Sequence, residues 1–140
     1  MRNRICLALV ILIGMNWSPA LSQTRENELS GRFLSAVITT SEPHRESLEG
    51  LIKGKPGLPS WVRNMMSRPR FIALASETVE IAGKPMELFR ACEAGRCAES
   101  ALAVLYTPDG KRAVLRIADD RLGVTIFGDA SEAELQVLSR

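Results

Sequence analysis

The stretch that decides the fold is residues 77–91, which read ETVEIAGKPMELFRA. Apolar and polar side chains alternate through residues 77–81, and the chain returns in the apolar-rich run 86–91. Alternation with a period of two is typical of a β-strand with one buried face. Gly83-Lys84 lies between the two runs, and glycine suits the positive-φ positions of a tight turn. The stretch therefore predicts a β-hairpin and, with it, an antiparallel sheet.

More strands and a helix are expected on the C-terminal side of this hairpin. The turn sequence Pro108-Asp109-Gly110 separates two apolar runs, because proline fixes φ and glycine takes the positive-φ position. Ser131 and Glu134 have the spacing of a capping box, so Ser131 should begin a terminal helix. Three runs have the composition of strands: 101–106, 113–117 and 122–127.

Helices are expected on the N-terminal side of the hairpin. A second helix should follow the first, with hydroxyl groups of Thr39-Thr40-Ser41 available as N-caps, Pro43 in its first turn and Gly54 at its end. Residues 58–62 predict a short helical turn that packs Trp61 onto the core. The pattern as a whole predicts an α+β fold: an antiparallel sheet of about five strands with N-terminal helices and a short C-terminal helix packed on it. The first helix is indicated by apolar residues at steps of three and four: Leu29, Phe33, Leu34, Val37 and Ile38.

The first 22 residues have the layout of a secretory signal peptide. Arg2 and Arg4 precede the apolar run 5–15, and Ala20-Leu21-Ser22 supplies small residues for cleavage after Ser22. The run is shorter than the roughly 20 residues that span a bilayer, so a permanent membrane anchor is not expected. We therefore expect residues 1–22 to be removed, residues 23–140 to form a single domain, and the protein to be exported to the periplasm.

The net positive charge of the full sequence comes from the predicted signal peptide. The full sequence has 18 Lys+Arg against 16 Asp+Glu, a formal charge of +2, and both surplus cations are Arg2 and Arg4. The mature chain is therefore formally neutral, and it contains no Lys/Arg block. Nucleic-acid binding would require a basic footprint, so this class of partner is excluded, as is attachment to a membrane after cleavage.

Two cysteines remain in the expected mature chain, Cys92 and Cys97, since Cys6 leaves with the signal. In an oxidising compartment their default state is a disulfide. It would close the loop Glu93-Ala94-Gly95-Arg96 and stiffen a turn that protrudes between two strands. Such a loop is either a staple of the hairpin or a binding element that loses little entropy on entering a partner's cleft. A redox role is the third alternative, although redox pairs usually have two intervening residues.

The sequence offers no visible catalytic apparatus. His44, the only histidine, falls in the first turn of an amphipathic helix, where we expect it to be exposed to solvent rather than to act as a general base. Asp119-Asp120 falls between two predicted strands, where paired acids usually mark a solvated turn. Two cysteines four residues apart do not supply a zinc site. We expect no metal, no cofactor and no enzymatic activity.

Several segments, in the same order, resemble the periplasmic inhibitors of vertebrate lysozyme (the Ivy family). The resemblance covers most of the mature chain. It implies an α+β fold, often dimeric, so a homodimer is a further expectation. It also implies that the disulfide-closed loop enters the active-site cleft of lysozyme. The segments that carry it, besides the helical opening, are Leu58-Pro59-Ser60-Trp61-Val62, residues 83–92 with Cys97, Ala103-Val104-Leu105-Tyr106 and Ile126-Phe127-Gly128-Asp129.

The loop of the type members reads Cys-Lys-Pro-His-Asp-Cys, and its histidine meets the catalytic carboxylates of the enzyme. This sequence differs from that loop at every position between the cysteines: Glu93, Ala94, Gly95 and Arg96 stand there. A guanidinium group is suited to carboxylates, so we expect Arg96 to be directed at the cleft and Glu93 to modulate it.

The partner is then lysozyme or another peptidoglycan-cleaving enzyme. The alternative is a periplasmic module that binds such enzymes or envelope components and has lost inhibition of c-type lysozyme, because Gly95 replaces the histidine. A thiol–disulfide enzyme ranks last. Vertebrate lysozymes are strongly basic, and a partner selected for their fast capture would gain from an acidic surface, but this chain has no net acidity to offer.

Overall fold

The computed structural model describes residues 31–140, and their fold is α+β, as the sequence predicts. The predicted signal peptide, residues 1–22, lies outside the described residues. In the described part of the chain, no helix is long and apolar enough to cross a membrane. The elements follow one another in this order: α2 (Leu34–Thr40), α3 (Glu42–Ile52), α4 (Ser60–Arg63), β1 (Phe71–Ala73), β2 (Glu77–Ile81), β3 (Lys84–Glu93), β4 (Ser100–Tyr106), β5 (Ala113–Asp119), β6 (Gly123–Phe127) and α5 (Glu132–Leu138).

The six strands form one antiparallel sheet in the order β1-β3-β4-β5-β6, with β2 also paired to β3. The predicted hairpin is confirmed, since Val79 lies opposite Met86 in the β2–β3 register. Strand β3 is long enough to pair with β2 along its first half and with β1 along its second, where Ala91 lies opposite Ala73. The sequence prediction missed β1, because a strand of three residues is too short to show an alternating pattern.

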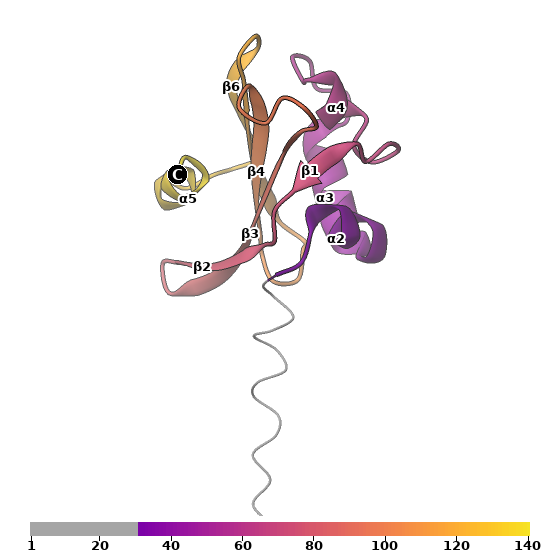
Figure 1. Ribbon diagram of the computed structural model, residues 1–140. Helices are drawn as coiled ribbons and strands as arrows, with labels where there is room; N and C mark the ends of the chain where they lie inside the picture. Colours follow the sequence, from indigo (N-terminus) through magenta and orange to yellow (C-terminus); the bar gives the residue numbers. More distant parts are fainter. Residues whose placement is uncertain (1–30) are drawn as a thin grey trace, which may run out of the picture.

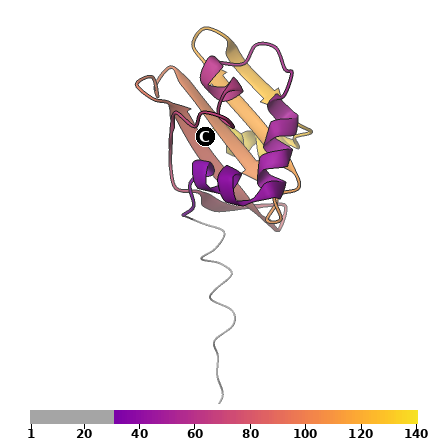
Figure 2. The same ribbon diagram turned by 90° about the vertical axis from the view of Figure 1, so that its right-hand side faces the viewer.

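Helices cover both faces of the sheet. In Figure 1, α2, α3 and α4 lie on one side of the strands and α5 lies on the other. Figure 2, turned by 90°, shows α2, α3 and α4 in front of the sheet. Side chains alternate along each strand, so β3 sends Phe89 to the core under α2–α4 and Leu88 to the core under α5. The N-terminal helices and the C-terminal helix therefore pack on opposite faces.

The first helix differs from its prediction. It begins at Leu34, and Phe33, expected on the buried stripe, is 49% exposed. The reason is that the chain before it pairs with Ser76. The backbone N–H of Gly31 donates to the carbonyl of Ser76 at 2.9 Å, and that of Ser76 donates to the carbonyl of Arg32 at 2.7 Å. These bonds hold residues 31 and 32 out of the helix.

Two other local predictions are confirmed. The Ser131 hydroxyl accepts from the Glu134 N–H at 3.3 Å, and the Glu134 carboxylate accepts from the Ser131 N–H at 2.8 Å, which completes the capping box of α5. Trp61 in α4 is 8% exposed, and its Nε1–H donates to the Ser100 hydroxyl at 2.8 Å. This bond joins α4 to the start of β4 and fixes the surroundings of the loop that precedes β4.

Candidate functional site: the disulfide-closed loop

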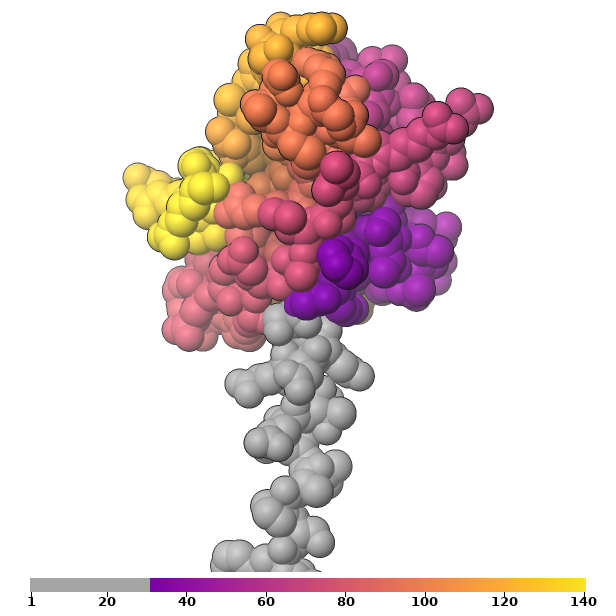
Figure 3. Space-filling model, viewed as in Figure 1, coloured from indigo at the N-terminus to yellow at the C-terminus, as the bar shows by residue number. Residues whose placement is uncertain are grey.

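The loop between β3 and β4 is closed by a disulfide between Cys92 and Cys97, whose Cα atoms are 4.8 Å apart. The predicted disulfide is therefore confirmed. Cys92 is part of the sheet, where it lies opposite Ile72 of β1 and Ala101 of β4. The base of the loop is consequently anchored in three adjacent strands. In Figure 3 this region, in coral, lies at the upper end of the molecule between the α4–β1 segment and the β5–β6 hairpin.

Backbone hydrogen bonds order the loop between and beyond the cysteines. The N–H of Arg96 donates to the carbonyl of Glu93 at 2.9 Å, and the N–H groups of Glu99 and Ser100 donate to the carbonyl of Arg96 at 3.0 and 2.9 Å. Gly95 takes φ = +80° in the turn, a conformation that favours glycine. The loop therefore has a defined shape before any partner binds.

The two charged residues of the loop bind each other. Arg96 donates from Nη1 to the Glu93 carboxylate and from Nη2 to the Asp120 carboxylate, both at 2.8 Å. Although desolvation alone would lower the pKa of Arg96, these carboxylates raise it above its usual value. The structure thus places Arg96, which we expect to be directed at the cleft, in contact with Glu93, which we expect to modulate it. The exposed tip of the loop is Ala94 and Gly95, which carry no charge.

The two aspartates next to the loop have different environments. Asp120 is exposed, but Asp119 is 8% exposed, so the expected solvated pair of acids is wrong for Asp119. Its carboxylate accepts from the N–H groups of Arg121 and Leu122 at 3.0 and 3.1 Å and thereby organises the β5–β6 turn. A hydrogen bond from the Ser100 hydroxyl, followed by these two backbone bonds, lowers the pKa of Asp119.

Two hollows that share Ser60 and Glu93 flank the loop, and a third, of about 280 Å³, lies on the side of Glu99 and Asp120. The first has a volume of about 300 Å³ and lies toward the β5–β6 turn. The second has a volume of about 350 Å³ and lies toward the segment that follows α4. The first is lined by Leu58, Pro59, Ser60, Arg63, Glu93, Arg96, Asp119, Arg121 and Leu122. The second is lined by Ser60, Trp61, Asn64, Arg68, Arg70, Glu93 and Ala94.

His44 is buried, so the expectation that it is exposed on its helix is wrong. Its residue exposure is 4%, and its ring packs against Tyr106 with the ring centroids 4.7 Å apart. Its Nδ1 is 2.7 Å from the Ser41 hydroxyl, while Nε2 has no hydrogen-bond partner and is 3.9 Å from a carboxylate oxygen of Glu87. Desolvation, then the charge of Arg32, lowers the pKa of His44.

Sequence periodicity could not place His44, because its burial depends on a turn 66 residues further along the chain. Gly110 lies so close to the imidazole that a Cβ there would be 2.2 Å from Nδ1. The missing side chain of Gly110 therefore makes room for the ring. The two hollows beside the loop are lined by neither His44 nor Glu87, so this buried cluster is separate from the candidate site.

Residues 31–140 contain no group of three or more His, Cys, Asp or Glu side chains placed to hold a metal ion. No protein-family model matches the chain, and a search of curated proteins finds no match either. The function of the loop is consequently inferred from its own chemistry and geometry.

Proposed function

We propose that the protein is an exported inhibitor that inserts its disulfide-closed loop into the active-site cleft of lysozyme or of another peptidoglycan-cleaving enzyme. It performs no chemistry of its own and needs no cofactor. The observation that carries the proposal is the loop itself: a short, cross-linked protrusion with an uncharged tip at Ala94 and Gly95, anchored in three strands. The resemblance in sequence to lysozyme inhibitors and the predicted signal peptide support the same function and a periplasmic location.

Preorganisation makes this loop suitable for insertion. Ordering one rotamer-rich side chain on binding costs roughly 0.5–1.5 kcal/mol, and ordering a flexible backbone costs more. Here the disulfide and the backbone hydrogen bonds to the carbonyls of Glu93 and Arg96 order the loop in the free protein. Its contacts with a cleft would therefore contribute to affinity with little entropic loss. The small side chains at the tip also allow entry into a narrow cleft.

Arg96 supplies the chemistry that a lysozyme-like cleft recognises. Such clefts hold two acidic side chains, of which one stays ionised. In the free protein Arg96 is bound by Glu93, whose side chain is 25% exposed, and by Asp120, whose side chain is 46% exposed. The Asp120 bond faces solvent, where ion pairs contribute little. Arg96 can therefore exchange Asp120 for a carboxylate of the enzyme while Glu93 keeps its guanidinium group in position.

One observation favours the alternative function, a module that binds peptidoglycan-processing enzymes without inhibiting c-type lysozyme. Both terminal nitrogens of Arg96 already donate to carboxylates of the same chain, so no free cation extends from the loop. The uncharged tip would then contact its partner through shape alone. The two functions differ in one measurable property, because only the first blocks the hydrolysis of cell walls.

A cell-wall lysis assay tests the proposal. The purified protein is titrated against a c-type lysozyme, a g-type lysozyme and a bacterial lytic transglycosylase, and the clearing of a cell-wall suspension is followed by turbidity. Dose-dependent protection against at least one enzyme is expected. Failure to inhibit all three would overturn the inhibitor function, and binding without inhibition in the same panel would establish the alternative.

Three variants test whether the loop is the part of the protein that inhibits the enzyme. Ala94→Trp enlarges the tip and should abolish inhibition, whereas Ala133→Trp, at an exposed position of α5 far from the loop, should not. Arg96→Ala should weaken inhibition at least about 10-fold, since charge-assisted hydrogen bonds to carboxylates are among the strong ones. Unchanged inhibition by Arg96→Ala would show that the cleft-directed role assigned to Arg96 is wrong.

A further inference from the structure

Arginines that form no ion pair in the described part of the chain line two of the hollows beside the loop. Together the two hollows are lined by five arginines and only two carboxylates, Glu93 and Asp119. Arg96 is bound by Glu93 and Asp120. The other four arginines are all exposed, and in the described part of the chain no carboxylate oxygen lies within 4.0 Å of their guanidinium groups. We call these four the arginine collar: Arg63, Arg68, Arg70 and Arg121.

The collar is assembled from segments that are distant in sequence. Arg63 ends α4, and its guanidinium group donates to the carbonyl of Leu58 at 3.0 Å. Backbone bonds order the segment that carries the next two, since the N–H of Arg68 donates to the carbonyl of Asn64 at 2.7 Å and the N–H of Arg70 donates to the carbonyl of Arg68 at 2.7 Å. Arg121 reaches the first hollow from the β5–β6 turn.

Folding stability does not account for the collar. The arginines that hold the fold together are paired, as Arg32 is with Glu87 and Arg112 is with Glu134. Four exposed cations around one loop instead repel one another and contribute no ion pair to stability. Arginine is also the charged residue most enriched in the energetically important parts of protein interfaces. The collar thus has the composition of a binding surface.

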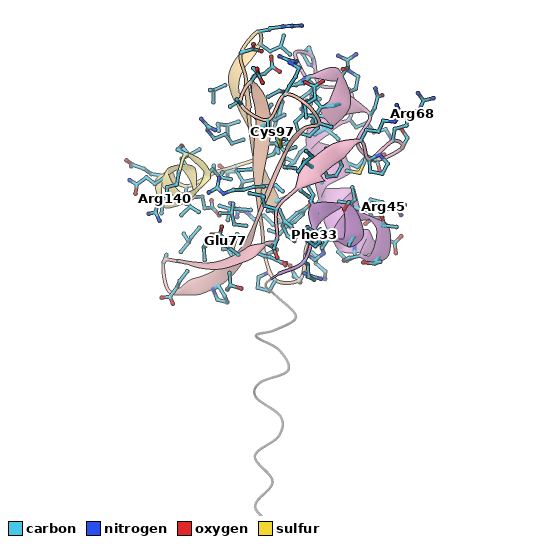
Figure 4. The ribbon with its side chains drawn as sticks, in the orientation of Figure 1. Phe33, Arg45, Arg68, Glu77, Cys97 and Arg140 are labelled. Carbon is cyan, nitrogen blue, oxygen red and sulfur yellow. A yellow bond between two sulfur atoms is a disulfide. The ribbon has the colours of Figure 1, made fainter. Side chains whose placement is uncertain are left out.

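The collar also places unpaired positive charge beside the loop of a chain that is formally neutral once the predicted signal is removed. Figure 4 shows Arg68 near the end that carries Cys97, while Glu77 of β2 lies at the opposite end. Glu77 and Glu80 on β2 are both exposed, as is Lys84 of the same hairpin, while Glu99 and Asp120 are exposed beside the loop. A charge distribution of this kind orients a protein as it approaches a charged partner and raises the association rate at low ionic strength. The four unpaired collar arginines would favour the approach of the loop to negative potential.

We infer that the partner of the loop is a protein whose cleft is rimmed by acidic side chains, which fits a bacterial peptidoglycan-cleaving enzyme of negative net charge better than a strongly basic vertebrate lysozyme. This inference rests on the proposed function and specifies its target. A protein fits better than an anionic polysaccharide, because Leu122, which lines the first hollow, is 50% exposed. An interface with such apolar contacts is typical of protein recognition.

The test compares two variants with the same change of charge. Arg68→Glu/Arg70→Glu reverses half of the collar, and Arg45→Glu/Arg140→Glu is the matched control, since both of these arginines are exposed and lie away from the Cys97 loop (Figure 4). Association rates are measured by surface plasmon resonance, at about 20 mM and about 150 mM NaCl, because salt screens long-range attraction. The probes are a bacterial lytic transglycosylase of negative net charge, a c-type lysozyme of positive net charge, and purified lipopolysaccharide.

We expect the wild-type protein to associate faster with the acidic enzyme than with the basic one. At low salt the collar variant should associate with the acidic enzyme at least about 10-fold more slowly, with the control within about 2-fold of wild type. Equal rates for collar variant and control would overturn the inference, as would preference for the basic enzyme or tighter binding of lipopolysaccharide than of either enzyme.

The outcome can be separated from that of the proposed function. If the protein blocks cell-wall lysis but the collar variant and the control associate alike, the inference about the target fails and the inhibitor function stands. If the protein binds the acidic enzyme through the collar but does not block lysis, the inhibitor function fails and the acidic partner stands. The variant Ala94→Trp, which changes the tip and leaves the collar intact, should abolish inhibition without reducing the salt dependence of association.

Discussion

Glu87 is the carboxylate on which a buried polar cluster depends, and its replacement by glutamine is the most informative single change in the fold. Its residue exposure is 1%. Its oxygens accept from Arg32 Nε at 3.1 Å, from Arg32 Nη2 at 2.6 Å and from the Ser76 hydroxyl at 3.1 Å. Glu87→Gln keeps the shape of the side chain, but it removes the charge and turns an amide N–H₂ group toward the guanidinium group.

The magnitude follows from the burial of the two partners. Removing one partner of a fully buried ion pair costs about 3–5 kcal/mol, because the other charge is left without compensation. The side chain of Arg32 is 35% exposed and can turn partly toward water, which reduces the cost. We expect Glu87→Gln to lower the free energy of unfolding by about 2–3 kcal/mol, or the melting temperature by roughly 10 °C for a domain of this size.

Urea denaturation followed by circular dichroism measures this loss. Glu49→Gln is the matched control, because Glu49 makes an exposed ion pair with Lys53 on α3 and the same chemical change there should cost less than about 0.5 kcal/mol. The linear denaturant slope should stay constant in both variants. If Glu87→Gln lowers the free energy of unfolding no more than Glu49→Gln does, then the buried cluster does not stabilise the fold.

Three further predictions concern stability. Gly110→Ala should cost roughly 3 kcal/mol in thermal denaturation, because its Cβ would meet the His44 ring, whereas Gly83→Ala, at a similar φ but in open space, should cost about 1 kcal/mol. A hydrogen bond from Arg112 is the main cause that lowers the pKa of Glu134 to about 2, so stability should fall as the pH drops from about 4.5 to about 2. Arg112→Gln should reduce the stability lost over this pH range by about 1–2 kcal/mol. The effect is no larger because the Arg112 side chain is nearly half exposed. Reducing the loop disulfide should lower the unfolding free energy by about 2 kcal/mol and leave far-ultraviolet circular dichroism unchanged.

The candidate site could be predicted only in part. The disulfide and the loop residues follow from the spacing of Cys92 and Cys97 and from the strands on either side, all of which lie close together in the sequence. The pairing of Arg96 with Asp120 could not be predicted, because it joins residues 24 positions apart through the β4–β5 register. For the same reason the sequence did not indicate the arginine collar.

What the sequence alone determined is the set of elements whose signal is local. The alternation in residues 77–81, the Pro-Asp-Gly turn and the Ser131–Glu134 capping box each act within a few residues, so β2, the β4–β5 turn and α5 were predicted correctly. Local patterns of this kind reflect the periodicity and hydrogen bonding of the backbone itself.

Tertiary structure decided the rest. His44 is buried because Gly110 leaves room for its ring, and Arg32 is held by Glu87 across 55 residues of sequence. The short β1 exists because β3 extends beyond β2 and leaves the rest of the same edge open for pairing. In each case the energy comes from a contact between distant segments, and the approach of those segments is fixed by the packed sheet and helices rather than by any local pattern. The same packing brings the collar arginines together around the loop.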